Sequence, residues 1–233
     1  MKISIITCTY NSEKYLLECL RSIEKQSHKD IEHIIIDAFS TDKTINIINK
    51  YIKRNSKIKI KFFQFPPRGI SNAMNFGIKH STGDIIHFLH SDDFYYSPDS
   101  LQKVNKYFQN NLKCNWLVGN HLLSIYKITI IFPDPFLFKI YTKAFLHFFP
   151  WMSHQNTFMK KNIYQKYGLF DETYKVHLDY EQWLRIIDHE QVLCLNDNFS
   201  VFRIHAGSTT FNPRNYLIGF QECLRAKKKY PIL

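Results

Sequence analysis

Strongly apolar runs alternate with amphipathic segments along the first half of the chain. The apolar runs are rich in β-branched residues and predict strands over residues 2–9, 31–37, 57–65 and 84–90. The segments between them have apolar residues at helical spacing and predict helices that extend to about residues 26, 52 and 80. Repeated strand–helix–strand order predicts a parallel sheet in an α/β domain, with ligands bound outside the carboxyl ends of the strands.

Polar residues mark where the first two helices should begin. Asn11 or Ser12 is placed to cap the first helix. Ser40 or Thr41 is placed to cap the second, because a side-chain oxygen there can accept the free N–H groups of the first turn. Asp42 suits the positive end of the same helix dipole.

The pattern loosens in the second half of the chain. A helix is predicted over 98–108 and a strand over 115–120. Residues 154–188 predict a strand, a helix, a loop and a second helix. Short strands should follow over 192–196 and 199–205, and a basic amphipathic helix from about Asn215. We find no repeat, low-complexity segment or linker in the sequence, so a single domain over 1–233 is expected.

Basic residues outnumber acidic ones by 31 to 20, which gives a formal net charge of +11. This excess favours an anionic partner, such as a phosphorylated ligand, an acidic membrane surface or nucleic acid, without choosing among them. The basic residues are spread along the chain rather than gathered with aromatic residues in one motif. Nucleic-acid binding is therefore not expected.

The cysteines and the apolar stretches indicate a compartment. Five cysteines are scattered without a CxxC pair, which indicates neither a disulfide framework nor a zinc site and suits a reducing cytoplasm. The N-terminal run is too short and too polar for a signal peptide, and no stretch approaches the roughly 20 apolar residues of a membrane span. A cytoplasmic protein is expected.

Acidic residues follow the predicted strands at the edge where ligands bind. Asp92 and Asp93 are adjacent, and two like charges there would repel unless a divalent cation lies beside them. Mn²⁺ and Mg²⁺ are commonly held by one or two carboxylates together with substrate phosphates. A Ser-Asp-Asp sequence is also common turn chemistry. Asp37, after the second strand, and Arg68, near the third, have turn or surface explanations singly, but their convergence on one edge favours a binding site.

The chain from Lys2 to about Ser208 resembles the family 2 glycosyltransferases in the order and spacing of several blocks. These blocks are "SIITCTYNSEKYLLECLRSIEKQS", "IIIDAFSTDKT", "PPRGISNAMNFGI", "STGDIIHFLHSDD" and "HQNTFMKKNIYQKYGLFDETYKVHLDYEQWLRI". The resemblance implies a GT-A fold, in which a Rossmann-like, mostly parallel sheet is flanked by helices. It also implies a nucleotide-sugar-binding half over 1–120 and an acceptor-side half over 121–233.

The resemblance implies a donor site for a nucleotide diphosphate sugar, usually a UDP-sugar. Thr9 and Tyr10 would border the base, with Tyr10 stacked on it. Asp37 would accept a hydrogen bond from the base imide, and Arg68 would lie near the base or the diphosphate. Asn72 stands where the family often has Asp, and it keeps hydrogen bonding while losing the charge.

The resemblance also implies a divalent metal, Mn²⁺ or Mg²⁺. Asp92 and Asp93 match the family's metal and ribose–diphosphate motif, with Asp93 favoured as the direct ligand. His205 is placed like a histidine that reaches the metal in some GT-A enzymes, although a lone histidine is more often structural.

Asp179 matches the family's catalytic base. In an inverting transfer, the acceptor hydroxyl attacks the anomeric carbon from the face opposite the leaving diphosphate, and the base must stand on that far side. Asp179 also suits an N-cap of the helix that follows it, and Glu181 is a neighbouring competitor for the role. His154 would either hydrogen-bond a sugar or lie in a core strand.

The resemblance implies an inverting hexosyl- or N-acetylhexosaminyltransferase. From the common roles of the family, it would act on a glycan or lipid-linked acceptor in bacterial surface polysaccharide or lipopolysaccharide biosynthesis. The aromatic segment 132–151 and the basic residues Lys227 to Lys229 would allow peripheral contact with an anionic membrane at its inner face. A catalytically silent nucleotide-sugar-binding protein and a nucleotidyltransferase are the alternatives. The sequence predicts no oligomeric state.

Overall fold

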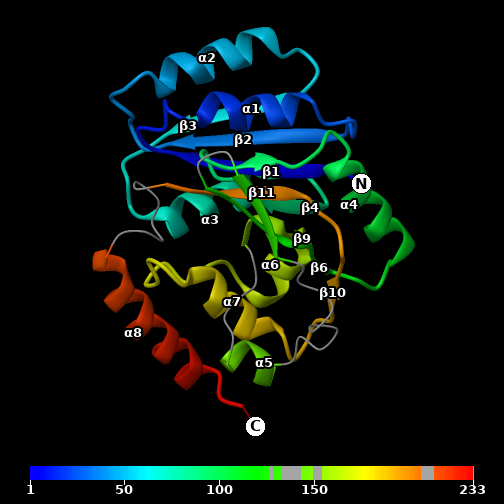
Figure 1. Cartoon of the computed structure of the whole chain (residues 1–233), viewed down its shortest axis with the longest axis vertical. Coiled ribbons are helices and arrows are strands. Elements are labelled where there is room, and N and C mark those ends of the chain that lie inside the picture. The colour runs from blue at the N-terminus through cyan, green and yellow to red at the C-terminus, as the bar shows by residue number, and fades with distance from the viewer. Residues whose placement is uncertain (126–127, 133–142, 149–153, 206–212, 233) are drawn as a thin grey trace.

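A seven-stranded sheet runs through the middle of the molecule (Figure 1). The computed structural model describes residues 1–125, 128–132, 143–148, 154–205 and 213–232. The strands of this sheet are β1 (Ile3–Thr9), β2 (Ile31–Asp37), β3 (Lys59–Gln64), β4 (Ile85–Phe88), β6 (Trp116–Val118), β9 (Thr157–Lys160) and β10 (Val192–Cys194). Their order across the sheet is β10-β6-β9-β4-β1-β2-β3.

Most neighbouring strands of the central sheet are parallel. β1 is parallel to β2 and to β4, β2 is parallel to β3, and β10 is parallel to β6, while β9 runs antiparallel between β4 and β6. The predicted α/β class with a mostly parallel sheet is therefore confirmed. Thr9 pairs with Asp37 in the register of β1 and β2, so the carboxyl ends of these strands meet at one edge.

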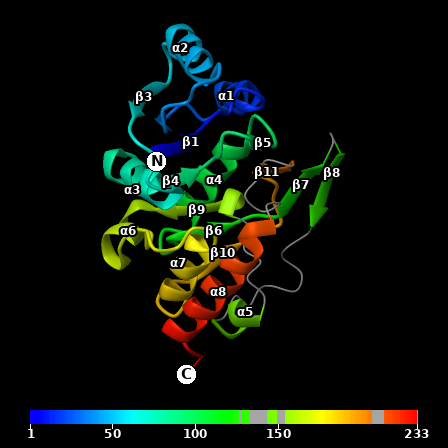
Figure 2. The ribbon, with the colours of Figure 1, turned by 90° about the vertical axis from the view of Figure 1, so that its left-hand side faces the viewer.

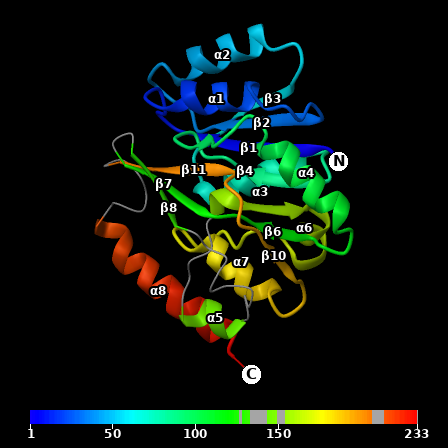
Figure 3. The same cartoon turned by 45° about the vertical axis from the view of Figure 1, so that its right-hand side comes forward.

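A second sheet of four strands follows the order β5-β11-β7-β8. Its strands are β5 (Phe94–Tyr95), β7 (His121–Ile125), β8 (Ile128–Phe132) and β11 (Ser200–Ile204). The sequence predicted only β11 among them. β5 begins directly after Asp93 and pairs antiparallel with β11, so this sheet starts at the carboxyl end of β4. Figure 3 shows β11, β7 and β8 standing to one side of the central sheet.

Helices cover both faces of the central sheet. They are α1 (Leu16–Glu24), α2 (Thr44–Arg54), α3 (Ile70–His80), α4 (Ser100–Asn110), α5 (Lys143–Phe148), α6 (Lys161–Tyr167), α7 (Leu178–Ile186) and α8 (Pro213–Lys229), with a 3-10 turn η1 (His154–Asn156) before β9. Successive side chains of β1 point to opposite faces. Ile5 packs with α1 and α4, and Ile6 packs with α3 and the helices of the second half of the chain.

The predicted caps of α1 and α2 were wrong. α1 begins at Leu16 without a side-chain cap. The Asn11 side chain instead accepts a hydrogen bond from the Thr41 N–H at 2.9 Å. In α2 it is Asp42 that accepts the Thr44 N–H, at 2.9 Å. These polar residues join the two strand-end loops to each other, a long-range use that a local cap rule does not predict.

The C-terminal helix α8 lies beside α7 and ends near α5 (Figure 2). The His147 ring nitrogen Nε2 and the Tyr230 carbonyl oxygen are 2.6 Å apart, which joins α5 to the residue just after α8. Within the described ranges, no helix is both long and apolar enough to cross a membrane. Most of the aromatic segment 132–151 falls outside the described residues.

Candidate active site

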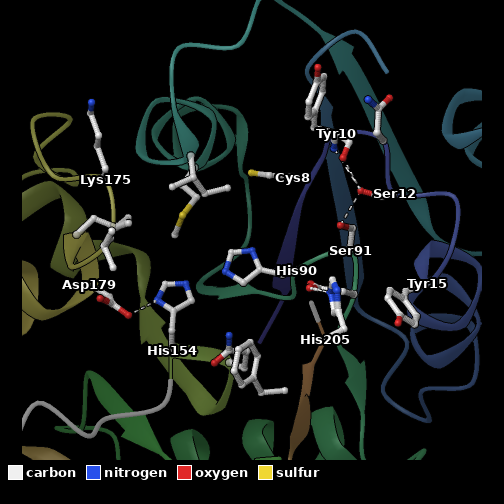
Figure 4. A pocket seen from close by; sticks show the side chains of 18 of the residues that line it. Cys8, Tyr10, Ser12, Tyr15, His90, Ser91, His154, Lys175, Asp179 and His205 are labelled. Atoms are coloured by element: carbon white, nitrogen blue, oxygen red, sulfur yellow. Dashed lines mark hydrogen bonds and ion pairs between the residues drawn. The ribbon is translucent and has the colours of Figure 1, made fainter. Parts of the chain in front are cut away.

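A cavity of about 640 Å³ opens at the carboxyl ends of β1 and β4. Its walls come from the ends of these strands, from α3 and α7, from η1 and from the residue after β11. Figure 4 shows Tyr10 and Ser12 at one end, His205 and Tyr15 on one side, and Asp179 and His154 on the other. Segments from both halves of the chain therefore meet at the edge where the sequence predicted a ligand.

Tyr10 lies at the mouth of this cavity with 62% of its surface exposed. The turn that presents it contains Asn11 at φ 47°, a left-handed conformation that Asn tolerates better than most residues. An exposed aromatic ring at the end of β1 is suited to stacking on a base. Phe39, at φ 56°, is 52% exposed and so does not point into the core.

Asp37 lies just behind this mouth and is fully buried. Its carboxylate accepts hydrogen bonds from the Thr9 hydroxyl at 2.8 Å, from the Ser40 hydroxyl at 2.6 Å and from the Ser40 N–H at 2.8 Å. Gln64 donates a fourth, at 3.3 Å. Asp37 and Thr9 therefore join β1, β2 and β3 at the sheet edge, and their contact with a base stays a prediction.

Asp92 lines the cavity and contacts His205. The Asp92 oxygen Oδ2 is 2.9 Å from His205 Nε2, although the two residues are 113 positions apart in the sequence. The His205 ring packs against Tyr15, with ring centroids 4.7 Å apart. The second sheet brings them together, because β11 ends at Ile204 beside the loop that follows β4.

Asp93 is fully buried and does not line the cavity. Its Oδ1 accepts the backbone N–H of Arg203 at 2.9 Å, which ties the loop after β4 to β11. Burial and the neighbouring Asp92 charge raise the pKa of Asp93 well above its usual range. Asp92, but not Asp93, therefore lines the cavity in this structure, and the expectation that Asp93 is the direct metal ligand stays a prediction.

The donor set of Asp92 and His205 fits a divalent cation that is also bound by phosphates. One carboxylate oxygen and one imidazole nitrogen already face each other at 2.9 Å. Among the described residues, no group of three or more His, Cys, Asp or Glu side chains could hold an ion. A cation here would therefore depend on substrate oxygens for most of its ligands, as Mg²⁺ and Mn²⁺ commonly do at diphosphates.

Asp179 lines the opposite side of the cavity, in the first turn of α7. Its Oδ1 accepts the Tyr180 N–H at 2.7 Å, and about 23% of its side chain is exposed. Burial raises the pKa of Asp179 to about 7, and the charge of Glu222 adds to this effect. A carboxyl group with a pKa near neutrality is suited to general base catalysis.

Glu181 is not available as a competing base. It is fully buried. Its carboxylate accepts hydrogen bonds from Arg185 at 2.8 Å, from Lys229 at 3.0 Å and from the Tyr230 hydroxyl at 2.8 Å. This network also shows that Lys229, one of the three basic residues expected to contact a membrane, is ion-paired and attaches the end of α8 to α7.

Sequence reasoning missed Glu222, a buried carboxylate on α8. It accepts three backbone N–H groups from the loop before α7, those of Lys175 at 2.7 Å, Val176 at 2.9 Å and His177 at 2.9 Å. Asp179 follows this loop by two residues, so Glu222 helps to fix the position of Asp179. The sequence feature that could have identified Glu222 is its place as an acidic residue on the inner face of α8, a helix that is otherwise basic.

Four predicted donor residues do not line the cavity, namely Thr9, Asp37, Arg68 and Asn72. Asn72 donates to Glu172 at 2.9 Å, and Asn75 donates to the same carboxylate at 2.9 Å. Arg68 is exposed at the residue before Gly69, outside the cavity wall. Their roles toward a donor stay predictions. His154, by contrast, lines the cavity from η1 rather than from a core strand.

The sheet is mostly parallel, and acidic residues lie beyond the ends of its strands. A further carboxylate lies across the cavity. This arrangement is typical of nucleotide-sugar transferases. The chain matches the description "Glycosyl transferase family 2" over residues 4–168 and belongs to that family. A glycosyltransferase of Haemophilus influenzae that carries no assigned specificity is 42% identical over 110 residues. The match spans 47% of this chain and 44% of that protein, so the chain aligns with less than half of this relative.

Solved structures show the same fold. Staphylococcus aureus TarS 1–349 in complex with UDP-GlcNAc superposes with a TM-score of 0.76 at 20% identity, over 100% of this chain and 68% of that one. A mannosyltransferase from Pyrobaculum calidifontis in complex with GDP-Man and Mn²⁺ superposes with a TM-score of 0.73 at 17% identity, over 96% of this chain and 64% of that one. The predicted GT-A fold is thereby confirmed.

Proposed function

We propose that the chain transfers a sugar from a UDP-sugar to an acceptor hydroxyl with inversion at the anomeric carbon. The observation that carries the proposal is the placement of the Asp92–His205 pair and Asp179 on opposite sides of one cavity. An inverting transfer needs such a division, with charge stabilisation at the leaving diphosphate and a base on the far face of the sugar. UDP-GlcNAc is the first donor to test, because TarS was crystallised with it.

In this mechanism, Tyr10 stacks on the base at the cavity mouth and the diphosphate lies near Asp92 and His205. Asp179 accepts the proton of the acceptor hydroxyl as its oxygen bonds to the anomeric carbon. The bond from that carbon to the diphosphate breaks, and its electron pair leaves with the diphosphate. Asp92 and His205 would hold Mn²⁺ or Mg²⁺, which supplies positive charge to the leaving group.

Calorimetric titration of UDP with and without Mn²⁺, on the wild type and on Asp92→Asn, tests the donor site. We expect binding that needs Mn²⁺ and weakens by about 10–100-fold in Asp92→Asn, because a metal ligand is lost. Asp84→Asn is the matched control, since the Asp84 side chain accepts the exposed Lys2 N–H at the opposite end of β4 and does not line the cavity. Equal binding in all three proteins, independent of Mn²⁺, would contradict the metal–diphosphate assignment.

We further propose that the acceptor is presented at an anionic membrane surface on the inner face of the cell membrane. The side of α8 that faces solvent carries Tyr216, Leu217, Phe220 and Leu224, each more than half exposed. Lys227 and Lys228 follow at the end of the same helix. An apolar stripe beside basic residues suits an anionic interface.

Flotation with phosphatidylglycerol vesicles, against phosphatidylcholine vesicles, tests this contact. We expect the protein to float with the anionic vesicles only, and Phe220→Ser with Leu224→Ser to abolish flotation. Protein that stays at the bottom with both vesicle types would exclude the contact.

A further inference from the structure

His154 lies beside Asp179 inside the cavity. Its Nδ1 is 3.7 Å from the Asp179 Oδ2, while Oδ1 of the same carboxylate is already bound to the Tyr180 N–H (Figure 4). The side chain of His154 is only 12% exposed. Its ring stacks on His90, with centroids 5.4 Å apart and planes at 16°, and its centroid lies 5.3 Å from that of Phe88. These ring contacts hold Nδ1 on the side of Asp179.

The surroundings of His154 favour one protonation form. Burial and the neighbouring rings of His90 and His87 lower the pKa of His154 well below its usual range, so the imidazole is neutral near pH 7. The other ring nitrogen, Nε2, is buried without a hydrogen-bond partner among the described residues. An unpaired buried N–H is rarer than an unpaired buried acceptor. The proton is therefore best placed on Nδ1, where it faces a carboxylate.

We propose that His154 is a positioning residue for Asp179, whose Nδ1–H fixes the carboxylate toward the acceptor hydroxyl. This inference rests on the proposed function, in which Asp179 is the base. A distance of 3.7 Å must shorten by about 0.7 Å to reach hydrogen-bond length, and such bonds often tighten only when the substrate is bound. The arrangement leaves the remaining lone pairs of Asp179 facing the cavity.

Several titratable groups besides His154 lie near Asp179 and also bear on the pKa values of this pair. Glu222 on α8 acts on Asp179 from behind the loop, and His90 and His87 on and after β4 face His154. Lys175 lines the cavity and is exposed. Within the described ranges, none of these groups is hydrogen-bonded to Asp179, whose Oδ1 accepts the Tyr180 N–H. The imidazole of His154 lies 3.7 Å from the Asp179 Oδ2.

Two substitutions separate hydrogen bonding from packing. His154→Phe keeps the ring stack and loses the donor. His154→Asn loses the ring and keeps an amide donor at the position of Nδ1. If His154 acts through its N–H, the pKa of Asp179 should rise by about one unit in His154→Phe and change little in His154→Asn, because a donor stabilises the charged carboxylate.

The pKa of Asp179 can be measured without substrate by NMR titration of ¹³C-labelled aspartate, with Asp179→Asn to assign the signal. Nitrogen-15 shifts of His154 in the wild type report the tautomer and need no variant. Nδ1 protonation together with the upward shift in His154→Phe supports the proposal. Protonation on Nε2, or an unchanged Asp179 titration in His154→Phe, overturns it.

Turnover then separates this inference from the proposed function. We expect His154→Phe to lose 10–100-fold in kcat with UDP binding unchanged, and His154→Asn to recover most of it. Full activity of Asp179→Asn would remove the base assignment itself, whatever the NMR titrations of His154 variants give. Full activity of His154→Phe, with Asp179→Asn inactive, would remove only the role of His154.

Discussion

The two acidic sides of the cavity are built differently. Asp92 has a partner at 2.9 Å, His205, which directly follows strand β11 near the other end of the chain. Asp179 lies 3.7 Å from the His154 ring nitrogen Nδ1, and burial raises the pKa of Asp179 to about 7. A carboxylate that helps to hold a cation must keep its charge, whereas a base must be able to gain a proton near neutrality. The difference in surroundings matches the difference between the roles that we propose for the two residues.

The two sides also differ in what holds them in place. The Asp92 side is fixed by strand pairing, since β5 and β11 bring the loop after β4 to His205. The Asp179 side is fixed by side chains that reach backbone groups, above all Glu222 with its three accepted N–H bonds. Removing the charge of Glu222 should therefore affect Asp179 in two ways, by shifting the loop before α7 and by changing the pKa of Asp179.

Asp179→Asn should produce the largest effect and act oppositely on activity and stability. Removing the base should lower kcat by about 10³-fold or more while UDP binding is retained. Its folded-state pKa, about 7, lies above the ordinary value of 3.8, so the folded protein binds the extra proton between these pH values. Stability contributed by that proton is complete below about pH 4 and is lost as pH rises to 7.

The neutral variant should then be more stable than the wild type at pH 8, by about 1–3 kcal/mol, and nearly equal to it at pH 4. Thermal melts at the two pH values measure this difference. The wild-type kcat/KM should rise with pH through about 7 as Asp179 loses its proton. A variant that is no more stable at pH 8 than the wild type would show that Asp179 is not a strained base.

The sequence predicted the part of the fold that follows from local pattern. The strands β1 to β4 and the helices between them were confirmed because each carries its own apolar periodicity. The hairpin of β7 and β8 and the short β5 were missed. β5 is only two residues long and forms by pairing with β11. A segment this short has no apolar periodicity from which a strand could be predicted.

The same limit applies to the site. The residue types at strand ends pointed to the edge where the cavity opens, but not to which of Asp92 and Asp93 faces it. That choice depends on the Arg203 N–H, which is 110 positions away from Asp93. Glu222 was missed for a similar reason, since its bonds to Lys175, Val176 and His177 cross 45–47 positions. Local chemistry predicts candidates, and tertiary pairing decides their orientation.

Glu222→Gln should lower kcat less than Asp179→Asn does, and it tests whether the Asp179 side of the cavity can change while the Asp92 side does not. The amide can still accept one or two of the three N–H groups but has lost the charge, so stability should fall by about 1–3 kcal/mol and kcat by about 10-fold. Because the Glu222 charge helps to raise the pKa of Asp179, the acid limb of the kcat/KM profile should move to lower pH. UDP affinity should stay unchanged, since the Asp92 side does not depend on α8.

Glu24→Gln is the matched control for this prediction. Glu24 pairs with Arg54 at 2.8 Å on the exposed surface of α1 and α2, where such a pair contributes about 0–1 kcal/mol. Its loss should leave kcat and the pH profile as they are. If Glu222→Gln lowered UDP affinity as much as kcat, the two sides would not be independent, and the loop before α7 would have to contact the donor as well as carry the base.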